Sequence, residues 1–267
     1  MKFACSSNMI EGKTLTEKAE KLASWGFDGI SVFFDYGLWS EEVRDELLHL
    51  EERTGVIPCE FAFGDDIYGH LMDPDPVLRK ASRDMYREAC EMAAALGAVT
   101  EYEFEYGPQS PLPLFHPYRK MDEAQEEAFL KLTEELSESL KGSSGYLLLE
   151  GINRYESPFL NSIRDCKDFL EKAGVPNTGV LADFFHMSIE ENDIPDAIRY
   201  AEAWIKHIHL GDNNRLLPGY GSTRWEESFR ALKEIGYDGF LNLECSTCGD
   251  PAETLPKTLE FLHGLAK

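Results

Sequence analysis

Basic residues are scarce in this sequence. It contains 26 lysines and arginines against 49 aspartates and glutamates, which gives a formal net charge of -23 at pH 7. A surface of this sign repels the phosphates of nucleic acids and of anionic lipids. We therefore expect a protein that acts on a small molecule and has neither a nucleic acid nor a membrane as its partner.

The features of membrane-spanning and small secreted proteins are also missing. The first residues, MKFACSSNMI, contain no long apolar stretch and no cleavage pattern, so we predict neither a signal peptide nor a transmembrane segment. The six cysteines are spread over positions 5, 59, 90, 166, 245 and 248. This spacing predicts free thiols in a reducing compartment, the CSTC stretch at 245–248 included, and a cytoplasmic protein.

Linkers, low-complexity tracts and internal repeats are absent as well. Instead, apolar β-rich runs alternate with helical patterns from end to end. The predicted strands are 2–6, 29–34, 56–63, 100–106, 146–152, 179–184, 205–210 and 240–245. The clearest helical stretches are 15–26, 76–97, 126–140 and 225–239.

Eight strand–helix units at about 33 residues each are typical of a (β/α)8 barrel. An open doubly wound sheet is the alternative, but no Gly-x-Gly-x-x-Gly motif follows the first strand, which weakens its dinucleotide-binding version. We predict an α/β fold in which residues 1–267 form a single (β/α)8 TIM barrel, with the active site at its C-terminal mouth. The long connections 64–75 and 107–120 follow strand ends and should lie at this mouth.

Each of the last four predicted strands ends with an ionisable residue. These residues are Glu150, Asp183, His209 and Glu244. In a barrel the strand ends converge on one mouth, and several carboxylates buried together there need a cation. We therefore predict that the four side chains hold a divalent metal. Their oxygen-rich set favours Mn²⁺, Co²⁺ or Mg²⁺ over Zn²⁺.

Four stretches of the C-terminal half also carry a family resemblance. They are LEGINRYE (149–156), ADFFHMSIEE (182–191), HIHLGDNNRLLPGYG (207–221) and GYDGFLNLE (236–244). In order and spacing they resemble the xylose isomerase-like barrel superfamily of sugar isomerases and epimerases, most closely the ketose 3-epimerases of the D-tagatose/D-psicose (allulose) type. The resemblance implies the same four metal ligands and substrate contacts at Glu156, His186 and Arg215. It also implies a homo-oligomer, either a dimer or a tetramer.

Such a site predicts a metal-dependent isomerase that inverts C3 of a free ketose through a metal-stabilised enediolate. Glu150 and Glu244 would act as acid and base from opposite sides of the reacting carbon. The expected cofactor is Mn²⁺ or Co²⁺, with Mg²⁺ as a further possibility. At the first strand the sequence departs from these epimerases, because CSSNM, with Ser6, Ser7 and Asn8, stands where they carry aromatic residues. This difference leaves the identity of the sugar open.

Other outcomes remain open with the same residues. An enediolate can expel a β leaving group, as in a dehydratase or lyase, or shift its carbonyl, as in an aldose–ketose (hydroxypyruvate-type) isomerase. Cleavage of DNA at apurinic sites would need more metal ligands and a basic groove, and the net charge speaks against it. The non-enzymatic alternative is a sugar- or metal-binding protein without turnover.

Three further polar residues have structural interpretations. His207 shares the strand parity of His209, so we expect a core histidine or a group that supports the metal ligands. Asp212 lies in the turn-rich GDNN stretch and is interpreted as a turn residue. Asp193 is predicted to cap the helix that contains Pro195.

Overall fold

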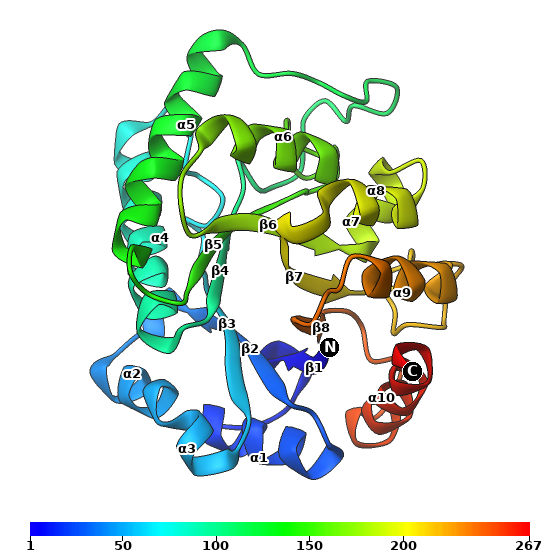
Figure 1. Ribbon diagram of the computed structural model, residues 1–267. Helices are drawn as coiled ribbons and strands as arrows, with labels where there is room; N and C mark the ends of the chain where they lie inside the picture. Colours follow the sequence, from blue (N-terminus) through cyan, green and yellow to red (C-terminus); the bar gives the residue numbers. More distant parts are fainter.

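The computed structural model describes residues 1–267 and confirms the predicted barrel. Eight parallel strands pair in chain order, and β8 closes the sheet against β1. Figure 1 shows the strands at the centre with the helices around them. The strands are β1 (Lys2–Ser6), β2 (Gly29–Asp35), β3 (Ile57–Gly64), β4 (Val99–Tyr102), β5 (Tyr146–Glu150), β6 (Thr178–Asp183), β7 (Ile205–Leu210) and β8 (Phe240–Leu243).

Ten α-helices connect the strands on the outside of the barrel (Figure 1). They are α1 (Leu15–Trp25), α2 (Glu41–Leu48), α3 (Leu50–Thr54), α4 (Pro76–Leu96), α5 (Glu123–Ser137), α6 (Ile163–Ala173), α7 (Phe184–Glu190), α8 (Ile194–Ala201), α9 (Trp225–Glu234) and α10 (Pro251–Ala266). None of them combines the length and the apolar composition that crossing a lipid bilayer requires.

The strands read as unbroken apolar runs because both of their faces are covered. In β5, Leu147, Leu148 and Leu149 are all fully buried, some against the helices and some in the barrel interior. The run ends at Glu150, which is also buried. Burial on both faces hides the two-residue alternation of an exposed sheet, so only the end of the run marks the position of the site.

Local signals define the helix ends as the sequence indicates. The side chain of Thr14 caps α1, which ends at Gly26 with φ 91°. Asp75 caps α4, whose first residue is Pro76. The predicted cap at Asp193 is confirmed, because its side chain accepts a hydrogen bond from the amide of Asp196 at the start of α8.

The fourth strand is shorter than the predicted 100–106, because β4 ends at Tyr102. Its pairing with β3 is limited to Glu60 against Val99. Few backbone hydrogen bonds to β3 therefore keep the residues after Tyr102 in an extended strand. The chain after β4 turns towards the β5–α6 connection instead, where the amide of Gly107 donates to the carbonyl of Glu156 at 2.8 Å. Residues 103–106 therefore belong to a loop at the mouth of the barrel.

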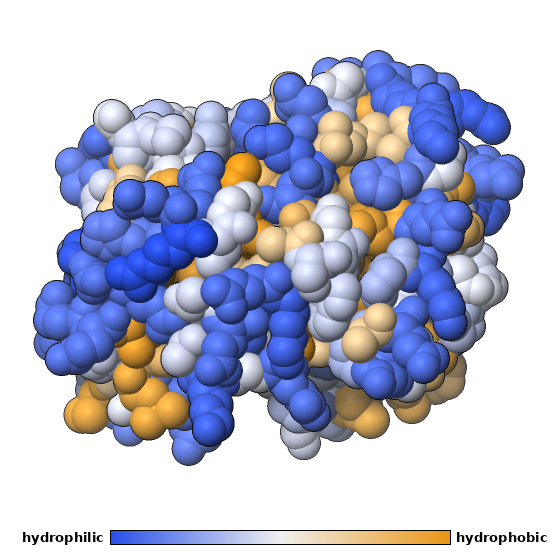
Figure 2. Space-filling view, turned by 90° about the horizontal axis from the view of Figure 1, so that it is seen from below, coloured by the Kyte–Doolittle hydropathy of each residue, from blue (hydrophilic) through white to orange (hydrophobic).

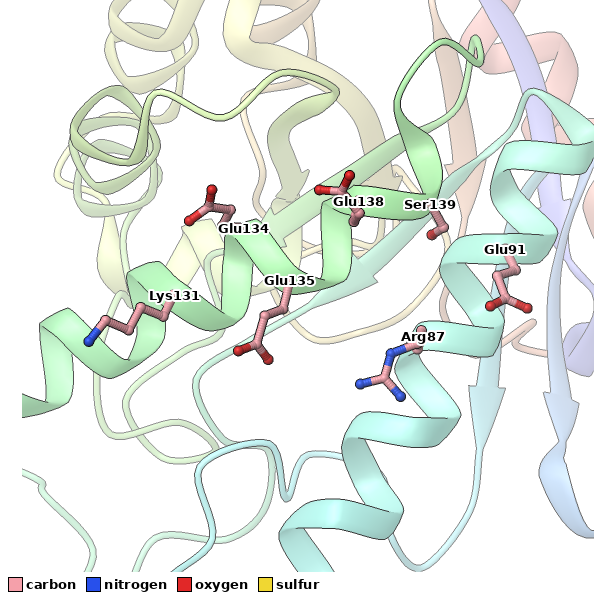
Figure 3. A pocket seen from close by; sticks show the side chains of 7 residues that line it. All are labelled: Arg87, Glu91, Lys131, Glu134, Glu135, Glu138 and Ser139. Atoms are coloured by element: carbon pink, nitrogen blue, oxygen red, sulfur yellow. The ribbon is translucent and has the colours of Figure 1, made fainter.

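The surface matches the acidic, polar composition. Figure 2 shows one face on which hydrophilic residues predominate and hydrophobic residues appear only in separate patches. A hollow of about 670 Å³ lies outside the barrel between α4 and α5 (Figure 3). It is an open groove whose lining is charged apart from one serine, and it contains Arg87, Glu91, Lys131, Glu134, Glu135, Glu138 and Ser139.

Candidate active site

A cavity of about 230 Å³ opens at the C-terminal mouth of the barrel. One part of its lining is aromatic and consists of Phe33, Phe63, Tyr68 and Tyr106. The other part is ionisable and consists of Glu101, Glu150, His186, Arg215 and Glu244. Tyr68 comes from the predicted connection 64–75, which therefore reaches the mouth. Tyr106, which was predicted at the end of a strand, lies in the loop after β4, and no residue of the connection 107–120 lines the cavity.

Three of the four expected metal ligands form one buried cluster in this cavity region. Donor atoms of Glu150, Asp183 and His209 all lie within 4.8 Å of one another. His209 Nδ1 is 3.9 Å from Glu150 Oε1 and 3.9 Å from Asp183 Oδ2, and it has no hydrogen-bond partner. An imidazole nitrogen that faces several carboxyl groups without a well-aligned hydrogen bond to any of them fits the donor set of a divalent metal.

The fourth expected ligand, Glu244, follows directly after β8 and approaches the same nitrogen. Its Oε2 lies 3.0 Å from His209 Nδ1. The guanidinium of Arg215 donates to Oδ2 of Asp183 and, at 2.6 Å, to Oε2 of Glu244. Arg215 thus supplies positive charge to two of the four groups. The structure pairs Arg215 with these two carboxylates and not with Glu156.

The carboxyl groups of the cluster differ in their electrostatic surroundings. Burial, followed by the charge of Glu101, raises the pKa of Glu150 well above its ordinary value. Burial also acts to raise the pKa of Asp183, but the nearby Arg215 outweighs it and lowers this pKa to about 2. Without a metal ion, these surroundings favour the protonated form of Glu150 and the charged form of Asp183. A divalent cation would favour the charged form of both.

His186 is held as a hydrogen-bond donor towards the cavity. Its Nδ1 accepts from the side-chain amide of Asn153 at 2.7 Å, and the same amide group donates to Oε2 of Glu156 at 2.6 Å. Because Nδ1 is an acceptor, the proton of the neutral ring is on Nε2, which lies 3.9 Å from Glu150 Oε1. Burial lowers the pKa of His186, which favours this neutral form. Asn153 therefore links two of the expected substrate contacts.

Arg215 depends on a loop that Asp212 organises. The buried carboxylate of Asp212 accepts hydrogen bonds from the amides of Gly219 at 2.9 Å and Thr223 at 3.0 Å, and from the indole of Trp225 at 3.0 Å. Asp212 thus acts on the turn, in agreement with the interpretation from sequence. Arg215 adopts φ 58° within this loop, and its guanidinium lies 4.9 Å from the ring centre of Phe185.

Two glutamates inside the barrel were not singled out from sequence. Glu60 on β3 is fully buried between His207 and His209, at 3.4 and 2.9 Å from their Nε2 atoms. Glu101 on β4 lines the cavity, and its Oε2 is buried without a hydrogen-bond partner. The signal was a glutamate within an apolar strand, in CEFAF and TEYEF. Neither glutamate ends its predicted strand, so neither met the criterion that identified Glu150, an ionisable residue at a strand end.

The polar first strand end does not supply the aromatic lining. Ser6 Oγ accepts from Asn242 at 2.9 Å, and Ser7 Oγ accepts from the amide of Phe33 at 3.2 Å. Both serines are buried and tie β1 to its neighbouring strands. The aromatic surface of the cavity comes from β2, β3 and the loops that follow β3 and β4 instead.

A model of the family described as "Xylose isomerase-like TIM barrel" matches residues 19–265. The D-psicose 3-epimerase of Enterocloster bolteae is 41% identical over 110 residues, a match that spans 41% of this chain and 36% of that protein. The D-psicose 3-epimerase of Ruminiclostridium cellulolyticum is 28% identical over 84% of this chain and 76% of its own length. The 3-dehydro-D-guloside 4-epimerase of Escherichia coli is 29% identical over 98% and 99% of the two chains.

Solved structures show the same fold. The D-psicose 3-epimerase from Clostridium cellulolyticum H10 with D-tagatose superposes with a TM-score of 0.86 at 24% identity, over the whole of both chains. The 3-keto-D-glucoside 4-epimerase from E. coli, in its apo form, has a TM-score of 0.85 at 21% identity over 99% of both chains. At this level of identity the likeness concerns the barrel alone.

Proposed function

The chain belongs to the xylose isomerase-like TIM barrel family, and from this premise we propose that it is a divalent-metal-dependent sugar epimerase that inverts C3 of a free ketose. One observation carries the proposal: two glutamates from different sides of the barrel, Glu150 and Glu244, line one cavity beside a buried metal-donor cluster. The ketose 3-epimerases among its relatives support the substrate class. The proposal includes a cytoplasmic homo-oligomer, a dimer or tetramer, as the family resemblance suggests.

Glu150, Asp183, His209 and Glu244 would hold the ion, for which Mn²⁺ or Co²⁺ fits the oxygen-rich donors and Mg²⁺ is a further possibility. When bound, the ion supplies a Lewis acid that polarises the ketose carbonyl and makes the neighbouring C–H bond more acidic. The orphaned His209 Nδ1 and the carboxyl groups around it are the structural support for this assignment.

The two glutamates then divide the proton transfers. β6 and β7 separate β5 from β8, so Glu150 and Glu244 approach the cavity from different directions. One carboxylate removes the proton from C3, and the other carboxylic acid returns a proton to the opposite face. The C–H bond that breaks is replaced by a new C–H bond, and the oxidation state of the sugar is unchanged. His186, through Nε2–H, and Arg215 can stabilise negative charge that develops on the sugar oxygens.

Exchange with solvent tests this function directly. We expect the purified protein with Mn²⁺ to incorporate one deuterium at C3 of a ketose in D₂O, together with formation of the C3 epimer, as measured by NMR and mass spectrometry. The control is the same protein treated with a chelator. Epimer formation without deuterium incorporation would contradict the acid–base mechanism.

A second candidate has specific support from the E. coli 3-dehydro-D-guloside 4-epimerase, which is similar over nearly the full length. In this version the substrate is a 3-keto glycoside, and C4 is the carbon that loses and regains a proton. The chemistry at the two glutamates is the same, since C4 is also next to the keto group. The position of the deuterium label, at C3 of a 2-ketose or at C4 of a 3-keto glycoside, distinguishes the two candidates.

The charges that line the cavity favour an uncharged sugar. Glu101, Glu150 and Glu244 face it, and its cation Arg215 is already paired with two carboxylates. Without a free basic group, a phosphate would meet mainly negative or acidic groups. We expect kcat/KM for a ketose phosphate to be about 100-fold below that for the parent ketose. Steady-state kinetics on matched pairs of sugars check this, and equal values would contradict it.

Glu101 is expected to bind a substrate hydroxyl. Its Oε1 accepts from the hydroxyl of Tyr68 at 2.9 Å, and burial raises its pKa well above the ordinary value, which favours the neutral carboxyl group at the cavity. Glu101→Leu should raise KM about tenfold, the effect of one lost hydrogen bond, with little change in kcat. Glu101→Gln, which keeps one donor and one acceptor, should stay within about threefold of the wild type.

The matched control is Glu103→Gln. This glutamate lies two residues further along, and its carboxyl group is held by Tyr68 and Tyr86 and does not line the cavity. It should leave KM unchanged. A Glu101→Leu variant with the wild-type KM would show that this carboxyl group does not touch the sugar.

A further inference from the structure

We propose that Glu60 is a positioning residue, which fixes the tautomer and the orientation of His209 at the metal centre. The inference deepens the proposed function and rests on the metal that this function requires. Glu60 lies in the middle of β3, outside the stretches that carry the family resemblance, and is fully buried in the barrel interior. A carboxylate buried there without a role would destabilise the fold by several kcal/mol.

The hydrogen-bond geometry defines the role. His209 Nε2 lies 3.1 and 2.9 Å from the two carboxylate oxygens of Glu60. The ring N–H therefore donates a bifurcated hydrogen bond to this carboxylate. With Nε2 committed to donating to Glu60, the neutral ring has its lone pair on Nδ1. Nδ1 is the atom that faces Glu150, Asp183 and Glu244. Glu60 therefore leaves the correct nitrogen available for a metal ion.

The carboxylate of Glu60 is itself held in place. The hydroxyl of Ser31, on the neighbouring strand β2, donates to its Oε2. His207 lies near the same oxygen, with 3.4 Å between Nε2 and Oε2, but its Nε2 makes no hydrogen bond. Side chains from β2, β3 and β7 thus form a series of hydrogen bonds through the barrel interior. It runs from Ser31 through Glu60 to His209, whose other ring nitrogen faces the proposed metal site. A carboxylate that accepts from the second nitrogen of a metal-ligating histidine strengthens metal binding by orienting the ring.

A direct test measures Mn²⁺ binding by isothermal titration calorimetry. Glu60→Gln keeps the shape of the side chain, but its amide can donate to Nε2 and so move the ring proton to Nδ1. We expect the dissociation constant for Mn²⁺ to rise about 10–100-fold relative to the wild type, at an unchanged stoichiometry of one ion. ¹⁵N chemical shifts of His209, recorded in the metal-free proteins at a pH where the ring is neutral, should show the proton at Nε2 in the wild type and a shift towards Nδ1 in the variant.

The matched control is His207→Gln. It alters the other histidine that contacts Glu60, on the same strand and at the same burial, but leaves no atom changed at the metal-facing edge. Its Mn²⁺ affinity should equal that of the wild type within the error of the titration. Two outcomes would contradict the positioning role. His207→Gln could lose Mn²⁺ affinity as strongly as Glu60→Gln, or the wild type could bind a second ion that both variants lose. Either result would mean that Glu60, His207 and His209 form a metal site of their own.

A milder variant covers the case in which Glu60→Gln does not fold. Ser31→Ala removes only the donor that orients the Glu60 carboxylate and should weaken Mn²⁺ binding a few-fold. If Glu60→Gln binds Mn²⁺ as tightly as the wild type, the role of Glu60 is overturned while the proposed function stands. If Glu60→Gln does not fold, the same conclusion follows from wild-type affinity in Ser31→Ala. A wild-type protein that binds no divalent ion overturns both.

Discussion

Glu150→Gln is expected to lower kcat for epimerisation by about 10²–10⁴-fold, and Glu244→Gln by a similar factor. Each change keeps the size of the side chain and removes a group that can take up and return a proton at neutral pH. Both residues line the cavity, so the substitutions act where we propose that the substrate binds. Steady-state rates of epimer formation measure the effect.

Deuterium exchange separates the two glutamates. If Glu150 takes the proton from one epimer and Glu244 from the other, each single variant should still exchange the proton of the epimer that its remaining glutamate attacks. Glu150→Gln and Glu244→Gln would then show exchange with opposite epimers, in D₂O and without inversion. Exchange with both epimers in either variant would contradict the assignment of one face to each glutamate.

The control for these variants is Asp183→Asn. Asp183 belongs to the metal-donor cluster but does not line the cavity, so it is not expected to transfer a proton. Its substitution should weaken metal binding and reduce exchange with both epimers alike. If the two glutamate variants behave in the same symmetric way, the glutamates act as metal ligands only.

Removal of divalent ions is expected to abolish epimerisation and to lower the melting temperature, and Mn²⁺ or Co²⁺ should restore both. The physical reason for the stability effect is that the ion binds the folded barrel and has no preformed site in the unfolded chain. At a free concentration of about 100 times Kd the stabilisation is about 2.7 kcal/mol. Thermal denaturation with and without added Mn²⁺ measures it. A melting temperature that does not respond to any divalent ion would contradict the metal centre.

Metal binding should also release a proton. Burial and the neighbouring carboxyl groups raise the pKa of Glu150 well above its ordinary value, which favours its protonated form in the absence of an ion. An ion bound there favours the carboxylate and displaces that proton. Calorimetry in buffers of different ionisation enthalpy should therefore give different apparent binding enthalpies at pH 7. In Glu150→Gln, which has no proton to lose, this difference should become smaller.

The barrel and the place of its mouth follow from the amino-acid sequence alone. Strong apolar runs of strand length, separated by capped helices, leave few arrangements other than eight parallel strands in chain order. Because the ends of these runs can be located in the chain, Glu150, Asp183 and His209 are expected at one edge of the barrel from their positions in the sequence. Their meeting follows from barrel closure and needs no information about individual side-chain contacts.

Which residues inside the strands face the centre depends on the folded barrel. Parallel strands are buried on both faces, so hydrophobic periodicity cannot tell an inward Glu60 or Glu101 from an outward neighbour. The partners of Arg215 were also beyond the sequence, because they depend on a loop that Asp212 holds through backbone amides up to eleven residues away. Strand ends are set by local sequence, whereas side-chain direction and loop contacts are set by how the closed barrel packs.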